Sequence, residues 1–315
     1  MGTAFASIVT VALSQLAVLL PAQKQQSKVW LTDFAAASAK AKAENKDLLV
    51  SFTGSDWHTP SIKLFVEILS KPVFENGAQK NFVLVTIDFP KVRAGMSKEL
   101  IAQNDKLMAR YGVAQLPTVL LVDSDGHPYQ WLTFEKGGPA AYLEALEKRR
   151  RQGLGFKAAL ALAARKTGID RAATIDDALV SLAVEMRSKN HELMREIIKL
   201  DADGKAGLKQ KYLMTVQLKD ATEYLEKLLA VHMEKGEGPA ALAKVEAVIT
   251  KPKDAMHHQM ALYLKGMLIM DTTHNVQDAL AALDLAMTIA PTSPLAPKIK
   301  QVRANIKASS GRGKE

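Results

Sequence analysis

Runs of apolar residues divide the first half of the chain into predicted strands separated by helix-like segments. Residues 48–52 and 82–87 are continuous apolar runs, a pattern typical of strands buried on both faces of a sheet. Residues 118–122 and 129–134 are two further stretches with strand character, and a Ser-Asp-Gly turn at residues 124–126 lies between them. The pattern therefore predicts two buried strands followed by an antiparallel hairpin.

Helical segments alternate with these strands. Residues 33–46 are rich in Ala and Lys and contain neither Gly nor Pro, which predicts a helix. The segment after the first strand is apolar on one side and is expected to end at Pro72. Residues 97–110 begin with a serine suited to a helix N-cap, and a last helix opens at Pro139 and ends near Arg151. The predicted order is one helix, then β, α, β, α, β, β, α.

No strand pattern survives after Gly153, and the rest of the chain predicts consecutive helices. A helical period links Ile175, Ala178, Leu179, Leu182 and Met186, and Thr174 with Asp177 forms a capping-box sequence that predicts a helix start. Farther on, the spacing of Ala279, Leu283, Ala286 and Pro291 resembles the second helix of a tetratricopeptide repeat, with Gly266 one residue upstream of its usual place. The second half is therefore expected to be an all-α array similar to such repeats.

The first strand runs into the sequence Trp57-His58-Thr59-Pro60-Ser61, which opens an amphipathic segment. A second notable stretch, Gly-Val-Ala-Gln-Leu-Pro-Thr at residues 112–118, precedes the hairpin. Together with residues 45–57, which enter the turn, these segments resemble the thioredoxin family over residues 29–150. The resemblance implies a thioredoxin-like α/β fold, a cis peptide bond at Pro117 and a redox turn in which His58 and Ser61 stand where the family has two cysteines.

The chain contains no cysteine at any position. Thiol and disulfide exchange needs a thiolate as nucleophile, so the reaction implied by the family cannot occur at this turn. A scaffold without its sulfurs still offers a surface for other polypeptides. By the resemblance, the backbone around the proline loop binds an extended peptide beside the turn by strand addition. The residues predicted to form this groove are Trp57, His58, Thr59, Pro60, Leu116 and Pro117.

Two alternatives to a non-catalytic protein-binding module remain open. The first is an enzyme with non-thiol chemistry, in which His58 acts as a general base for Ser61 or as a metal ligand with Asp56. Among the remaining histidines, those at 127, 257, 258 and 274 have no recognised ligand spacing, so the sequence predicts no metal site and no cofactor. The second alternative is structural, with the thioredoxin-like part serving as a rigid cap for the helical array.

The N-terminus predicts export. Residues 3–22 are weakly polar, with an apolar core at residues 8–20 and Pro21-Ala22 before a polar stretch. This is typical of a signal peptide cleaved near Ala22, and an uncleaved anchor is the alternative because about 20 apolar residues span a bilayer. Either alternative places the folded part in the periplasm or outside the cell.

Length and charge complete the prediction. At 315 residues the chain suits two domains, and its net charge of +9 comes from scattered Lys and Arg residues. The one dense basic run, residues 148–151, falls at a predicted helix end, where cations complement the helix dipole. We therefore expect no nucleic-acid partner and no membrane contact beyond the N-terminal segment. The predicted segments are 1–22 (signal or anchor), 23–152 (thioredoxin-like), 153–307 (helical) and 308–315 (a disordered tail).

Overall fold

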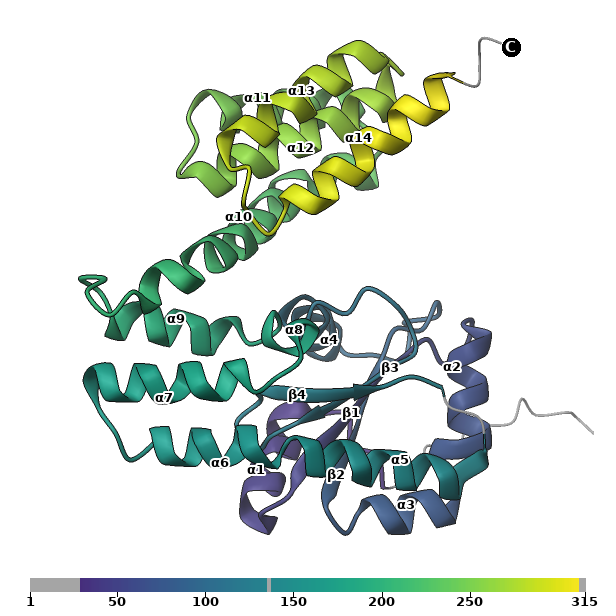
Figure 1. Ribbon diagram of the computed structural model, residues 1–315. Coiled ribbons are helices and arrows are strands. Elements are labelled where there is room, and N and C mark those ends of the chain that lie inside the picture. Colours follow the sequence, from purple (N-terminus) through teal and green to yellow (C-terminus); the bar gives the residue numbers. More distant parts are fainter. Residues whose placement is uncertain (1–28, 135–136, 312–315) are drawn as a thin grey trace, which may run out of the picture.

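The computed structural model describes residues 29–134 and 137–311, and the predicted signal segment lies outside these residues (Figure 1). The described chain forms an α/β part built on one sheet, followed by a long series of helices. This confirms the predicted fold class of a thioredoxin-like sheet followed by an all-α region. None of the helices in the described ranges is both long enough and apolar enough to cross a bilayer.

The sheet has four strands in the order β2-β1-β3-β4. The strands are β1 (Asp47–Thr53), β2 (Phe82–Asp88), β3 (Thr118–Val122) and β4 (Pro128–Leu132). Strand β1 pairs in parallel with β2 and antiparallel with β3, and β3 and β4 form the predicted hairpin. All seven residues of β1 are buried, because this central strand is covered on both faces.

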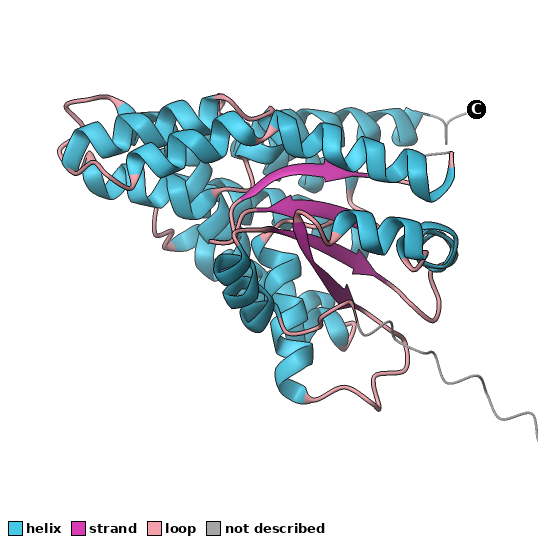
Figure 2. Cartoon of the chain, turned by 90° about the horizontal axis from the view of Figure 1, so that it is seen from below, coloured by secondary structure: helices cyan, strands magenta, loops and turns pink. Residues whose placement is uncertain are grey.

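Helices cover both faces of the sheet (Figure 2). They are α1 (Phe34–Glu44), α2 (Thr59–Leu64), a π-helical turn η1 (Phe65–Leu69), α3 (Pro72–Ala78), α4 (Lys98–Arg110) and α5 (Gly138–Gln152). Helices α1 and α4 lie together, since Gln103 accepts a hydrogen bond from the Phe34 N–H at 2.9 Å. Helix α5 packs against α3 and η1. Two helical layers therefore enclose the sheet, as the predicted βαβαββα order requires.

The remaining helices extend from the sheet in two groups (Figure 1). Their bounds are α6 (Leu154–Ala163), α7 (Gly168–Val180), α8 (Val184–Arg187), α9 (His191–Leu200), α10 (Leu208–Glu234), α11 (Gly238–Thr250), α12 (Ala255–Thr272), α13 (Val276–Ile289) and α14 (Ala296–Gly311). Helices α6, α7 and α9 pack together beside the sheet, and the 27-residue helix α10 carries the chain to α11–α14. In α12, Gly266 lies against α13, because a Cβ there would come within 2.9 Å of Leu283 Cγ.

One apolar core joins the sheet to the first of these helices. Its buried residues run from Trp30 to Val216 and include Phe156 of α6, Ile175 of α7 and Ile197 of α9. Smaller buried clusters hold α10–α14 together. The predicted domain boundary after residue 152 therefore falls inside a shared core, and both that boundary and the likeness of α11–α14 to tetratricopeptide repeats stay predictions.

Three details differ from the sequence-based expectations. The helix after the turn ends at Leu69, but Pro72 opens α3, since a proline lacks the N–H that the first helical turn leaves unused. Thr174 lies inside α7, and its hydroxyl donates to the Asp170 carbonyl at 2.8 Å, so it caps nothing. Helix α14 continues to Gly311, into the segment predicted to be disordered, because no Pro or Gly follows Pro297 of its first turn until residue 311. Residues 312–315 lie outside the described part.

Candidate functional site

The turn that follows β1 has the geometry of a strand-to-helix connection with a bulky aromatic folded over it. Gly54 follows the last residue of β1, and α2 begins at Thr59 with Pro60 in its first turn. The Trp57 indole lies directly over Gly54, where an added Cβ would come within 2.9 Å of Trp57 Cε2. Glycine is therefore required here by the close approach of the indole rather than by its backbone angles.

His58 and Ser61, the residues at the sulfur positions, contact each other. His58 Nδ1 and Ser61 Oγ lie 2.9 Å apart, and the Gly54 N–H donates to Ser61 Oγ at 3.3 Å. Ser61 is only 1% exposed. A nucleophilic hydroxyl has to reach its substrate, and this one is enclosed and already hydrogen-bonded on two sides. The pair therefore holds the turn and the start of α2 together.

Trp57 is anchored and exposed at the same time. Its Nε1–H donates to the Phe89 carbonyl at 2.8 Å, and its side chain remains 43% exposed. The Lys91 ammonium lies 5.7 Å from the ring centroid, and the His58 ring meets the indole edge to face at 5.3 Å. The indole is consequently held in one orientation while it presents apolar surface to solvent, a combination found at binding hot spots.

The loop after β2 forms a second wall of the turn. Asp56 accepts the backbone N–H groups of Lys91 and Val92 at 2.9 and 3.1 Å. Ser55 donates through both its N–H and its hydroxyl to Asp88, at 2.9 and 2.5 Å. No local sequence pattern marks this loop as part of the site. The signal that could have found it is the parallel pairing of β1 with β2, which brings the carboxyl ends of both strands to one edge.

The predicted groove residues Leu116 and Pro117 reach the same edge of the sheet. The Leu116–Pro117 peptide bond is cis, and both residues are partly buried. Since Phe52 pairs with Thr118 across β1 and β3, the proline precedes β3 at the level where β1 ends and the turn begins. The backbone topology therefore places both segments of the predicted groove, 57–60 and 116–117, at the same end of the neighbouring strands β1 and β3.

The histidines do not gather into a metal site. Within residues 29–134 and 137–311, no group of three or more His, Cys, Asp or Glu side chains is arranged to hold a metal ion. His257 contacts Asp254 and His274 contacts the Met270 carbonyl, each through a local interaction. These two histidines, like His58, therefore serve the structure close to their own positions in the chain.

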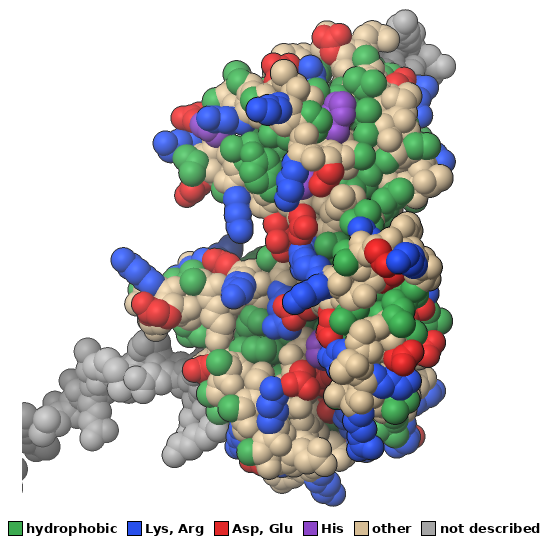
Figure 3. Space-filling model, turned by 90° about the vertical axis from the view of Figure 1, so that its left-hand side faces the viewer, with side chains coloured by type: hydrophobic (Ala, Val, Ile, Leu, Met, Phe, Trp, Pro, Cys, Tyr) green, Lys and Arg blue, Asp and Glu red, His purple; other side chains and the backbone are tan. Residues whose placement is uncertain are grey.

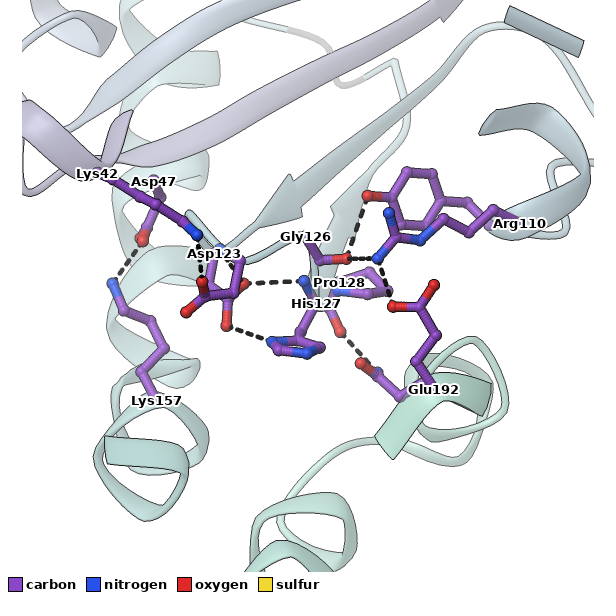
Figure 4. Close-up of polar contacts among 12 residues, drawn as sticks. Lys42, Asp47, Arg110, Asp123, Gly126, His127, Pro128, Lys157 and Glu192 are labelled. Carbon is purple, nitrogen blue, oxygen red and sulfur yellow. Dashed lines mark hydrogen bonds and ion pairs between the residues drawn. The ribbon is translucent and has the colours of Figure 1, made fainter. Parts of the chain in front are cut away.

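The helical region attaches to the opposite end of the sheet (Figure 4). There the Lys157 ammonium of α6 bonds the buried Asp47 carboxylate at 2.5 Å. On the β3–β4 turn, burial acts to lower the pKa of His127. The hydrogen bond to Asp123 and the negative charges of Asp123 and Asp125 act in the opposite direction and outweigh burial, so the pKa of His127 lies above its usual value. Because α6–α9 attach at this end, the groove end of the sheet is left clear of them.

Charged side chains of both signs share the surface. On the face shown in Figure 3, blue basic and red acidic side chains are interspersed, and they crowd together at the waist between the upper helices and the lower part. Ion pairs between Lys or Arg and Asp or Glu join many of these side chains in the described chain, and in most of these pairs at least one partner is partly buried. The mixture accounts for a net positive charge without a single-sign patch on this face.

Comparisons with known proteins agree on the N-terminal half. Residues 29–124 match a family described as thioredoxin-like. The disulfide bond reductase DsbH of Chlamydia pneumoniae is 32% identical over 114 residues, which cover 36% of this chain and 68% of that protein. The thioredoxin-related protein DsbJ of the same organism is 33% identical over 99 residues, which cover 31% of this chain and only 28% of DsbJ.

Two solved structures are also similar to part of the chain. A DsbH oxidoreductase is 29% identical with a TM-score of 0.37, over 39% of this chain and 85% of that one. The oxidised C-terminal domain of Neisseria meningitidis DsbD is 20% identical with a TM-score of 0.29, over 38% of this chain and 98% of that one. All four comparisons cover less than two fifths of the chain.

Proposed function

Because the chain belongs to the thioredoxin-like family yet contains no cysteine, we propose that it is a redox-inactive member whose groove binds extended segments of other proteins. The relative DsbH is named a disulfide bond reductase, a reaction that requires thiolates. Loss of both sulfurs removes that reaction but leaves the backbone of the groove. The proposed role is therefore binding without catalysis.

The observation that supports this role most directly is the anchored and exposed Trp57. An indole that is 43% exposed while its N–H is bonded to Phe89 loses little side-chain entropy when a partner covers it. Beside it, the loop ending in Leu116 and Pro117 offers backbone groups to an extended chain. A partner would gain backbone hydrogen bonds from the loop and apolar contact from the indole.

The test uses short random peptides displayed on phage and selected on the full chain. The affinity of an enriched peptide is then measured for the wild type and for Trp57→Ala, Pro117→Ala and the control Tyr224→Ala, an aromatic side chain on α10 that is 49% exposed. We expect the two groove variants to bind at least about tenfold more weakly and the control to bind unchanged. Unchanged affinity in both groove variants would remove the groove from the account.

The same variants separate binding from the alternatives. If the thioredoxin-like part is only a cap for the helices, Tyr224→Ala or other changes in α10–α14 would reduce peptide binding and the groove variants would not. If His58 carries non-thiol chemistry, His58→Ala would abolish a hydrolytic activity, whereas the enclosed Ser61 favours a structural pair. We expect no turnover to depend on His58.

Export, repeat-like helices and protein partners belong to the same proposal. The apolar segment at residues 3–22 supports delivery to the periplasm or cell exterior, by a cleaved signal or a retained anchor. The intact mass of the chain recovered from fractionated cells tests export, since cleavage near Ala22 removes the segment. Retention of the chain in the cytoplasm would contradict export.

Helices α11–α14 would supply a second protein-binding surface similar to tetratricopeptide repeats.

A further inference from the structure

A cavity of about 610 Å³ lies at the sheet end opposite the groove. Its walls come from the end of α4, the β3–β4 turn, the α8–α9 connection and the middle of α10. The walls thus belong both to the sheet and to the helix that leads to α11–α14. Neither the redox turn nor the predicted groove contributes a residue.

Basic side chains outnumber acidic ones around this cavity. Among the described residues that line it, six are Lys or Arg and four are Asp or Glu. Two of the acids are already engaged, Glu192 with Arg110 at 2.7 Å and Glu223 with Lys219 at 3.3 Å. Arg195 in turn pairs with Asp220 outside the lining, so three lysines stand against two carboxylates and the cavity keeps an excess of one positive charge.

Lys189 shows this excess at one ammonium group. Its Nζ donates to the carbonyls of Tyr111 and Gly112 at 2.6 and 2.9 Å, so its described partners are neutral oxygens rather than a carboxylate. Burial and then the positive charge of Lys219 lower the pKa of Lys189. Both effects would be relieved by a negative charge within the cavity.

Two buried polar atoms beside these cations lack a hydrogen-bond partner among the described residues. Asn190 is 2% exposed; its Nδ2 donates to the Pro128 and Met186 carbonyls, while its Oδ1 accepts nothing. The neighbouring His191 Nδ1 is also buried and unpaired. An unpaired acceptor such as Asn190 Oδ1 costs free energy unless a donor from a bound molecule reaches it.

From this arrangement we infer that the cavity binds a small dianion that also carries a hydroxyl group, such as hydrogen phosphate or a hydroxydicarboxylate. The negative charge lies against Lys189, whose described partners are neutral carbonyls, and the hydroxyl donates to Asn190 Oδ1. Charge-assisted bonds of this type are the strong ones in partly buried sites. The bound ion would join the turn of the sheet to α10.

The test uses matched pairs of probe ions on the full chain in isothermal titration at mildly alkaline pH. Phosphate is compared with sulfate and malate with succinate, since the second ion of each pair is a dianion without a hydroxyl. We expect phosphate or malate to bind with saturation, and its partner about tenfold more weakly. Which of the two binds distinguishes a phosphate ligand from a carboxylate ligand.

Two variants keep the outcome decisive. Lys189→Gln removes the charge and retains a donor, and we expect it to weaken binding about tenfold, while Lys235→Gln, at the exposed end of α10, leaves binding unchanged. Lys106→Gln, on the exposed rim of the cavity, replaces the first variant if that one unfolds. Three results would overturn the inference. The first is a heat of titration no larger than that of NaCl at equal ionic strength, and the second is sulfate and succinate binding as tightly as phosphate and malate. The third is equal affinity in all variants.

Discussion

The partly buried imidazole of His191 makes the stability of the protein depend on pH in a predictable way. Burial and then the charges of Lys219 and Arg195 lower the pKa of His191 from 6.5 to about 4. Between pH about 6.5 and about 4 the unfolded chain therefore binds a proton at this residue more readily than the folded chain does. It follows that folding stability falls as the pH falls through this window.

The size of the effect follows from the two pKa values. Proton linkage between a folded pKa of about 4 and an unfolded pKa of 6.5 removes about 2 kcal/mol of unfolding free energy between pH 7 and pH 5. His191→Gln cannot titrate, so it lacks this loss. Urea unfolding of wild type and variant at both pH values, followed by tryptophan fluorescence, gives the difference directly, because the contributions of all other groups cancel.

His127 provides a control of opposite sign. Its pKa is raised by Asp123, so its contribution to stability is fully present below the unfolded pKa and is lost as the pH rises through the folded pKa. His127→Gln should therefore lose relatively more stability than wild type on acidification, while His191→Gln loses less. Equal pH dependence in wild type and His191→Gln would refute the assignment of a partly buried, neutral imidazole at residue 191.

Two further substitutions test the packing of the junction by urea unfolding. Gly153→Ala places a Cβ 2.1 Å from Cδ2 of the buried Tyr129 ring and should lower the free energy of unfolding by about 1 to 3 kcal/mol. Gly155→Ala is the control, because an added Cβ there has nothing within 4 Å and should cost no stability. Equal effects of the two substitutions would contradict the packing. Lys157→Met removes the ammonium partner of Asp47, a residue that is only 4% exposed, and should lower the free energy of unfolding by about 3 kcal/mol. A loss below about 1 kcal/mol would show that the pair contributes no more than a surface ion pair does.

The sequence allowed the sheet, the turn after β1 and the cis proline to be predicted because their signals are local. The continuous apolar runs became β1 and β2, Ser97 caps α4 by accepting the Leu100 N–H, and the loop before β3 contains the expected cis proline. Each of these features depends on residues within a few positions of one another, where propensity, capping and a family motif act directly.

Contacts between distant segments could not be predicted in this way. Lys157 and Asp47 are 110 positions apart, and Trp57 and Phe89 are 32 apart, so neither pairing leaves a local pattern. Thr174 misled the prediction for a related reason, since a capping-box sequence inside a longer helix is overridden by the packing of α7. The basic cavity assembles four separate elements and has no contiguous motif at all.

Hydrogen exchange on the complex with a selected peptide tests the central claim most directly. If the groove binds an extended chain, amides at residues 113–118 and 54–61 gain protection in the complex, and amides of α11–α14 do not change. Protection confined to the helices beyond residue 208, with the turn and the proline loop exchanging as in the free protein, would contradict the account.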